Sequence, residues 1–179
     1  MKSHNLSQHG FTLLELVVVI IIISILGLVA VNRSAQWGEI AERAGLQTVV
    51  GTIRTALGLE TARLAIHHHL DRLPNLVDTN PMDLLAQTPD NYTGTVEREA
   101  RAGPEGSWYF VNSSHLLVYH LKRTDGFSSQ LTGAPRVRFR IKLIYTDNNH
   151  NGRFDRGIDD IGGLDLVPAE AFSWQPPQP

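Results

Sequence analysis

The chain of 179 residues contains no cysteine. Disulfide bonds are therefore excluded, and the fold must be stabilised by packing, with a bound metal as the only further candidate. The formal net charge of −2 favours no polyanionic partner. Proline is absent before Pro74, so no residue of that type interrupts a helix in the first part of the chain.

Sequence motifs of common enzyme classes are also missing. The chain has no Gly-x-Ser-x-Gly, His-Glu-x-x-His, P-loop or Gly-x-Gly-x-x-Gly pattern. His115 and His120 fall in predicted strands without an evident nucleophile or base beside them. We therefore expect that the protein is not an enzyme.

One long hydrophobic run is present, at residues 11–31, and its only charged residue is Glu15. A helix rises about 1.5 Å per residue, so this run is long enough to cross a bilayer. A carboxylate within such a run costs on the order of 2.5–3.5 kcal/mol on insertion scales. No Lys or Arg lies within one helical turn of it. Cleavage after Gly10 would create a cation nearby, the α-amine of Phe11.

The residues around this bond resemble a known motif. Residues 10–15 read Gly-Phe-Thr-Leu-Leu-Glu, after a short polar leader and before the aliphatic run. This arrangement is similar to the prepilin signature of type IV pilins and type II secretion pseudopilins. The resemblance implies cleavage between Gly10 and Phe11 by a prepilin peptidase, and N-methylation of Phe11. It also implies that Glu15 of one subunit meets the Phe11 amine of its neighbour in a helical filament.

An ordinary signal anchor or secretory signal is the alternative interpretation of the same residues. A secretory signal has an apolar region of about 7–15 residues and ends at an Ala-x-Ala-like site. The run at residues 11–31 is longer and no such site follows it. The prepilin interpretation is therefore favoured.

The resemblance further implies a function, a location and partners. We expect a structural subunit of a type II secretion pseudopilus or a type IV pilus-like filament, minor or pseudopilin-like. It is expected as a single-pass inner-membrane protein with a cytoplasmic N-terminus, its C-terminal part being periplasmic or, in the filament, extracellular. The implied partners are other pilin subunits, prepilin peptidase and the assembly platform, and no nucleic acid is expected. The alternatives are a membrane-anchored periplasmic calcium-binding module and a membrane-anchored enzyme, neither in a filament.

The hydrophobic pattern predicts that the helix continues past the run. Charged residues such as Glu39 and Glu42 are expected largely off its apolar face. We predict one helix over about residues 12–70, with 11–31 in the membrane and 32–70 as an amphipathic continuation. The apolar residues recur at steps of 4, 3, 4 and 7 and form a stripe on one helical face: Leu46, Val50, Ile53, Leu57 and Leu64.

The rest of the chain is predicted to form a connection and a sheet. Residues 71–106 contain several prolines and glycines and are predicted as a variable connecting loop packed over the sheet. Within it, Asn80 and Pro81 predict the N-cap and first residue of a short helix. Residues 107–179 are predicted to form an antiparallel sheet with a C-terminal loop. The expected fold class is α+β, with the long N-terminal helix packed on this small sheet.

Three strands are predicted, over residues 107–111, 115–122 and 136–145. The third alternates from Arg136 to Leu143, with apolar residues on one face and Arg or Lys on the other, and Tyr145 continues the apolar face. The apolar face is expected to lie on the helical stripe. The basic face is interpreted as solvated or as a subunit-docking surface, because the aromatic residues that would stack on bases mostly lie on the opposite face.

A series of oxygen donors follows the third strand and predicts a calcium site. Calcium is the one cofactor that the sequence suggests. Ile158 occupies the twelfth position of the loop, where a bidentate glutamate is usual, so Asp159 or Asp160 would have to replace it. Major pseudopilins carry a calcium site in their C-terminal loops, although the ligand spacing here differs from theirs. A simple turn that closes the strand remains the alternative. The expected ligands are Asp147, Asn149, Asn151, the carbonyl of Arg153, and Asp155.

Overall fold

The computed structural model describes residues 11–99 and 103–175. The chain divides into two compact units, residues 1–38 and residues 39–179. We call the second unit the sheet unit. The predicted leader at residues 1–10 lies outside the described residues. The described elements are α1 (Leu13–Ile66), the 3₁₀ helices η1 (Leu70–Leu76) and η2 (Pro81–Leu84), and the strands β1 (Tyr92–Val96), β2 (Trp108–Val111), β3 (Leu116–His120), β4 (Phe127–Ser129), β5 (Arg136–Thr146), β6 (Asp160–Pro168) and β7 (Phe172–Trp174).

The predicted continuous helix is confirmed, although α1 ends at Ile66 and not near residue 70. It ends there because His68 adopts a left-handed backbone conformation, with φ of 57°. The N–H of His68 donates to the carbonyl of Ala65 at 3.1 Å, and the N–H of His69 donates to that of Leu64 at 2.8 Å. These two bonds form a Schellman motif, which satisfies the last carbonyls of a helix and stops it.

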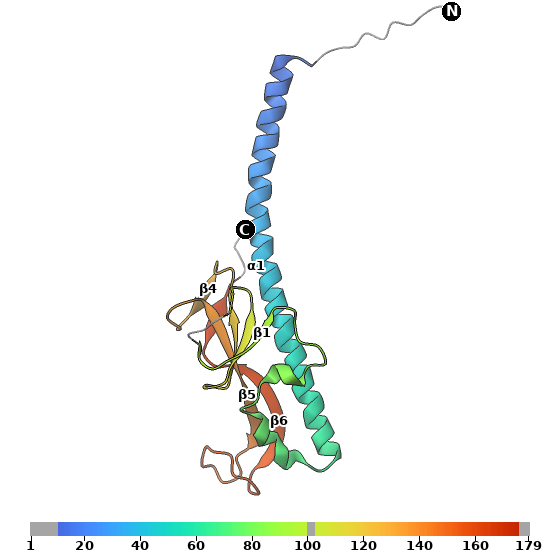
Figure 1. Cartoon of the computed structure of the whole chain (residues 1–179), viewed down its shortest axis with the longest axis vertical. Helices are drawn as coiled ribbons and strands as arrows, with labels where there is room; N and C mark the ends of the chain where they lie inside the picture. Colours follow the sequence, from blue (N-terminus) through green and yellow to red (C-terminus); the bar gives the residue numbers. More distant parts are fainter. Residues whose placement is uncertain (1–10, 100–102, 176–179) are drawn as a thin grey trace, which may run out of the picture. The chain divides into compact units, whose positions relative to one another are not determined.

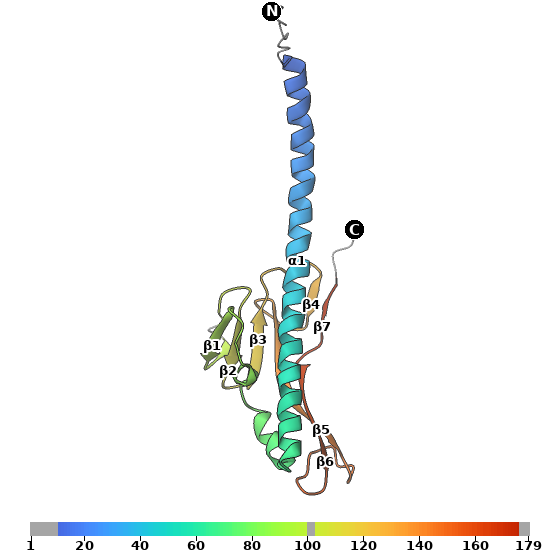
Figure 2. The same ribbon diagram turned by 90° about the vertical axis from the view of Figure 1, so that its right-hand side faces the viewer.

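The main sheet has five strands in the order β1-β2-β3-β5-β6, and β4 and β7 form a separate pair. Figure 1 shows the paired strands β5 and β6 beside each other, and Figure 2 labels all the strands. Strands β2, β3, β5 and β6 are joined by antiparallel pairings. Strand β1 runs parallel to β2, with Tyr92 opposite Trp108. The α+β class is therefore confirmed, and the sheet is antiparallel except at the β1 edge.

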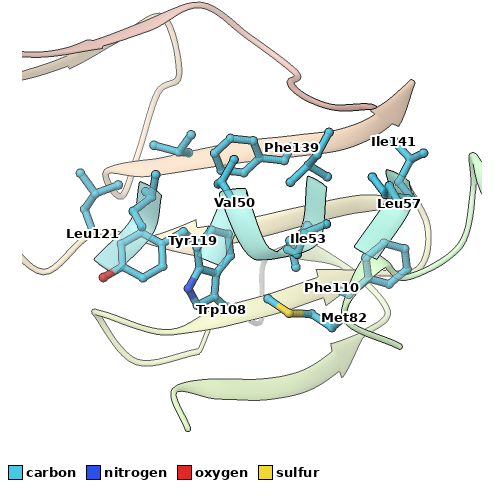
Figure 3. Packing of buried hydrophobic residues seen from close by; sticks show 14 of the residues in the cluster. Val50, Ile53, Leu57, Met82, Trp108, Phe110, Tyr119, Leu121, Phe139 and Ile141 are labelled. Carbon is cyan, nitrogen blue, oxygen red and sulfur yellow. The ribbon is translucent and has the colours of Figure 1, made fainter. Parts of the chain in front are cut away.

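The core of the sheet unit lies between α1 and the sheet. Figure 2 shows the α1 segment of this unit crossing the sheet, with β1 to β3 on one side and β5 and β6 on the other. The predicted stripe on α1 is confirmed, since Leu46, Val50, Ile53, Leu57 and Leu64 are all buried. Figure 3 shows Val50, Ile53 and Leu57 among apolar side chains of β2, β3 and β5. The aromatic contacts there include Trp108 with Tyr119, whose ring centroids are 4.8 Å apart.

The strand predictions are confirmed at β2, β3 and β5 and miss the remaining strands. The apolar face of β5 is buried as predicted from Val137 to Leu143. Strand β6 lies in the part of the chain that the sequence analysis assigns to a C-terminal loop, but it pairs with β5 from Phe139 to Thr146. Its Gly162-Gly163 pair looks like a turn in the sequence. In the structure, Gly163 has a φ of 149°, beside a register shift in this pairing.

The connection expected over residues 71–106 contains η1, η2 and β1. The predicted cap of its short helix is confirmed, because the Asn80 side chain accepts a hydrogen bond from the N–H of Met82 at 3.2 Å, with Pro81 first in η2. The Asn80 amide also donates to the Tyr92 hydroxyl at 2.9 Å. Because Met82 is fully buried in the core, this connection forms part of the fold.

The sheet face opposite α1 is more enclosed than the basic row of β5 suggested. The side chains of Arg136 and Arg138 are mostly buried, and both pair with the carboxylate of Glu99. Arg138 also pairs with Glu170, beyond β6. Arg140 remains exposed and donates to the carbonyl of Ala169 at 3.2 Å. Two arginines of the basic row therefore form ion pairs within the sheet unit, with the carboxylates of Glu99 and Glu170.

Candidate functional site

The first turn of α1 contains the residues of the predicted processing and assembly motif. The hydroxyl of Thr12 accepts a hydrogen bond from the backbone N–H of Glu15 at 3.2 Å, as an N-cap residue does for the third residue of a helix. Thr-x-x-Glu is also the sequence pattern of a capping box. A carboxylate in the first turn interacts favourably with the helix dipole. Glu15 therefore stabilises the start of α1 even without a cationic partner.

Phe11 and Glu15 are both exposed in the structure, and Phe11 is 77% exposed. Gly10 lies outside the described residues. In the part of the chain that the structure describes, no cation forms an ion pair with Glu15. Within these residues the Glu15 carboxylate therefore has no cationic partner.

The apolar side chains around Glu15 are exposed on every side of the helix. From Phe11 to Leu28 the large hydrophobic residues are between 38% and 81% exposed. A helix that is apolar all round is normally buried in lipid or in protein. A surface of this kind marks an interaction site. The side chains from Phe11 to Leu28 therefore form a candidate interaction surface.

Residues 5–31 match the family model of the prokaryotic N-terminal methylation motif. The chain carries the signature of type IV pilins and pseudopilins. Neither a curated protein nor a solved structure matches the chain. The resemblance noted for residues 10–15 is thus confirmed for the N-terminal segment, and such a motif indicates a membrane-anchored subunit that is processed by prepilin peptidase and assembles with other pilin subunits.

Within the described residues, no helix is both long and apolar enough to span a membrane. The membrane span over residues 11–31 stays a prediction.

The predicted calcium ligands lie in the loop between β5 and β6. The Asp147 carboxylate accepts hydrogen bonds from the backbone N–H groups of Asn151 and Gly152, at 3.2 and 2.7 Å. The side-chain amides of Asn149 and Asn151 both donate to one carboxylate oxygen of Asp155. The structure therefore brings Asn149, Asn151 and Asp155 together around a turn whose backbone is held by Asp147. Arg153 contributes a backbone N–H to this turn, bonded to the Asn151 side chain at 2.8 Å.

The same loop is also closed by hydrogen bonds of its own. Asp159 is buried, and its two carboxylate oxygens accept from the N–H groups of Asn148 at 3.0 Å and Asp155 at 2.7 Å. Both oxygens are thus already used by the backbone, and Asp160 accepts from the Asn148 side chain at 3.1 Å. Residues 11–99 and 103–175 contain no cluster of three or more His, Asp or Glu side chains suited to a metal. The oxygen donors of the loop suit Ca²⁺. A calcium site therefore stays a prediction, and a simple turn stays the alternative interpretation.

Sequence reasoning missed two buried carboxylates on α1. Glu39 is 3% exposed and the Glu42 side chain is 6% exposed. A signal for them was present, because the stripe that begins at Leu46 reaches Glu42 and Glu39 when it is extended backwards by steps of four and three residues. They were placed off the buried face because charged residues are rarely buried unless they have partners.

Proposed function

We propose that the protein is a structural subunit of a type II secretion pseudopilus or a type IV pilus-like filament. The observation that carries this proposal is Glu15, a lone carboxylate in an exposed apolar helix that matches the N-terminal methylation motif. We propose a structural role and not a catalytic one. Before assembly, residues 11–31 would hold the subunit in the inner membrane with the sheet unit on the periplasmic side.

The chemistry of the mature N-terminus supports this proposal. Cleavage after Gly10 leaves a charged amine on Phe11, close to Glu15 on the same helix. In an apolar environment each charge is costly unless it is paired. A neighbouring subunit offers the same amine, so pairing between subunits would satisfy both charges and set the register of the helices. The proposed partners are other pilin or pseudopilin subunits, prepilin peptidase and the assembly platform.

The exposed apolar segment supports the same conclusion. Before assembly, lipid would cover the side chains from Phe11 to Leu28, and afterwards the helices of neighbouring subunits would do so. A calcium-binding module or an enzyme on a simple anchor would need the apolar residues but not Glu15. The carboxylate therefore favours the filament over either alternative. The long connection over residues 71–106 and the absence of cysteine, and so of a disulfide loop, favour a minor or pseudopilin-like subunit.

The test uses the variants Glu15→Ala and Glu15→Gln, expressed in the native host. Glu60→Ala is the control, because Glu60 is a carboxylate of α1 that lies outside the motif and pairs with Arg63 on the surface. Intact-mass measurement should show loss of residues 1–10 and addition of a methyl group in all variants. Because the chain has no cysteine, single cysteines introduced at Leu16 and Ile20 can report contacts between helices without background disulfides. Crosslinked multimers should fall sharply in both Glu15 variants and remain in Glu60→Ala. A mature chain that begins at Met1, or normal crosslinking of both Glu15 variants, would contradict the proposal.

A further inference from the structure

The two buried carboxylates of α1 lie where the sheet unit begins. Glu39 and Glu42 are one helical turn apart, on the face that carries the core residues. Among the described residues of α1, Leu46 is the first buried hydrophobic residue. Among residues 37–45, the side chains of Glu39 and Glu42 are therefore the ones that α1 buries. Such groups are kept in a fold only when they are hydrogen-bonded, because burying a charge is otherwise costly.

Glu42 binds the chain that leaves β3. Its carboxylate accepts hydrogen bonds from the backbone N–H groups of Lys122 at 2.7 Å and Arg123 at 3.0 Å, and from the hydroxyl of Tyr119 at 3.1 Å. The Arg123 guanidinium lies 4.0 Å away. One side chain of α1 thus fixes two consecutive peptide groups, which lie 80 and 81 residues further along the chain.

Glu39 binds the C-terminal strand. Its carboxylate accepts a hydrogen bond from the indole N–H of Trp174 in β7 at 3.0 Å. Trp174 also packs edge-on against Phe127 of β4, with ring centroids 5.9 Å apart. Gly126, just before β4, has a φ of 68°, and a Cβ there would lie 2.5 Å from the carbonyl oxygen of Gln175 and 3.6 Å from the Glu39 carboxylate. Strands β4 and β7 therefore close tightly on the Glu39 side chain.

We propose that Glu39 and Glu42 form a carboxylate clamp that makes the β3–β4 connection and β7 depend on the first turns of α1 in the sheet unit. If these turns leave the sheet, the N–H groups of Lys122 and Arg123 and the Trp174 indole lose their acceptors together. Residues 122–127 and β7 would then open as one cooperative part, while the core from Leu46 onwards stays packed. This device does not depend on the filament proposal, since every contact lies within the sheet unit.

Trypsin provides a direct readout, because Lys122 and Arg123 are themselves cleavage sites. The full chain in detergent micelles is digested, and the cleavage rate after residues 122 and 123 is followed by mass spectrometry. Glu42→Ala should raise this rate about tenfold or more, because proteolysis follows the population of the locally open form and the variant removes acceptors of buried donors. Cleavage after Arg54, in the packed part of α1, should stay as in the wild type. Glu60→Ala, on the same helix but outside the clamp, is the control and should leave both rates unchanged.

Trp174→Phe tests the coupling, because it removes the indole N–H and keeps an aromatic ring far from the scissile bonds. Cleavage after Lys122 should rise severalfold in this variant. The combined Glu42→Ala, Trp174→Phe variant should be cut faster than either single variant, by about the product of the two effects, because both changes lower the free energy of the same opening and cleavage follows the open population. The clamp is overturned if Trp174→Phe is cleaved after Lys122 within twofold of the wild-type rate, or if the combined variant is cleaved no faster there than Glu42→Ala. It is also overturned if Glu60→Ala accelerates cleavage there as much as Glu42→Ala does.

Discussion

Two tyrosines on neighbouring strands show how a hydroxyl contributes to stability only when it has a partner. Tyr119 of β3 donates to Glu42 at 3.1 Å. Tyr109 of β2 is fully buried on the other face of the sheet, and within the described residues its hydroxyl is the buried side-chain polar atom without a hydrogen-bond partner. A buried donor without an acceptor costs about 1–3 kcal/mol. The same chemical group should therefore have opposite effects at the two positions.

We predict that Tyr109→Phe raises the free energy of unfolding by about 1 kcal/mol at neutral pH, because it removes an unpaired buried hydroxyl. Tyr119→Phe should lower it by about 1.5–3 kcal/mol, because that hydroxyl donates to a carboxylate. Chemical denaturation of the two variants beside the wild type provides the measurement. Equal losses in both variants would contradict the assignment of Tyr109 as unpaired.

The pH dependence of stability provides a second measurement on Tyr109. Burial, together with the nearby charge of Glu99, raises the pKa of Tyr109 to about 12. A raised tyrosine pKa means that the folded state favours the neutral phenol. This contribution to stability is complete below the unfolded-state pKa of about 10 and is lost as the pH rises through about 12. Tyr109→Phe should lose less stability than the wild type between these two pH values.

At the scale of elements, the end of α1 depends on one backbone conformation. His68 holds the left-handed position of the Schellman motif, a position that glycine usually occupies because it has no Cβ. We predict that His68→Gly raises the free energy of unfolding by up to about 1 kcal/mol. His67→Gly, one residue earlier, should lower it, because His67 has no left-handed conformation to relieve. Thermal unfolding by circular dichroism gives both values, and stabilisation by both variants would contradict the assigned helix end.

The elements that could be predicted from the sequence are those whose signal is local. The stripe from Leu46 to Leu64 and the alternation along β5 repeat at helix and strand periods, so their buried faces were predicted correctly. Strand β1 could not be predicted in this way, because it is stabilised by a parallel partner that follows it in the chain. Strand β6 was missed because its Gly-Gly pair is also typical of turns, and only the pairing with β5 makes it a strand.

The residues of the candidate site likewise differ in whether a local sequence signal marks them. The prepilin motif is contiguous, so Phe11 and Glu15 could be identified from the sequence. The clamp joins Glu39 to a tryptophan that is 135 residues away, and no local pattern marks that contact. The loop from Asp147 to Asp155 lies between these cases, because its residues are contiguous but its hydrogen bonds suit a turn as well as a metal.

At the scale of the whole molecule, calcium would act on the stability of the sheet unit. A ligand that binds only the folded state stabilises it by about 2.7 kcal/mol at a hundredfold excess over Kd. We predict that the full chain in detergent melts several degrees higher in millimolar Ca²⁺ than in chelator, with Mg²⁺ a poor substitute. The Asp147→Asn, Asp155→Asn double variant should lose this difference.

Asp159→Asn is the matched control for the calcium measurement. Because Asp159 accepts two backbone N–H groups in the same loop, its replacement should lower the melting temperature in chelator and in Ca²⁺ alike. If the wild type melts at the same temperature in both buffers, the loop is a turn and the calcium prediction is wrong.

The sheet order and the contact between Glu39 and Trp174 have a consequence for how the protein is made. Strand β6 supplies one edge of the main sheet, and β7 reaches back to a residue that is synthesised 135 positions earlier. Contacts between such distant residues form late, because the chain between them must first be ordered. While a ribosome or a membrane channel still holds β7, the contact between Trp174 and Glu39 therefore cannot form. The clamp would then close only after β7 has been released.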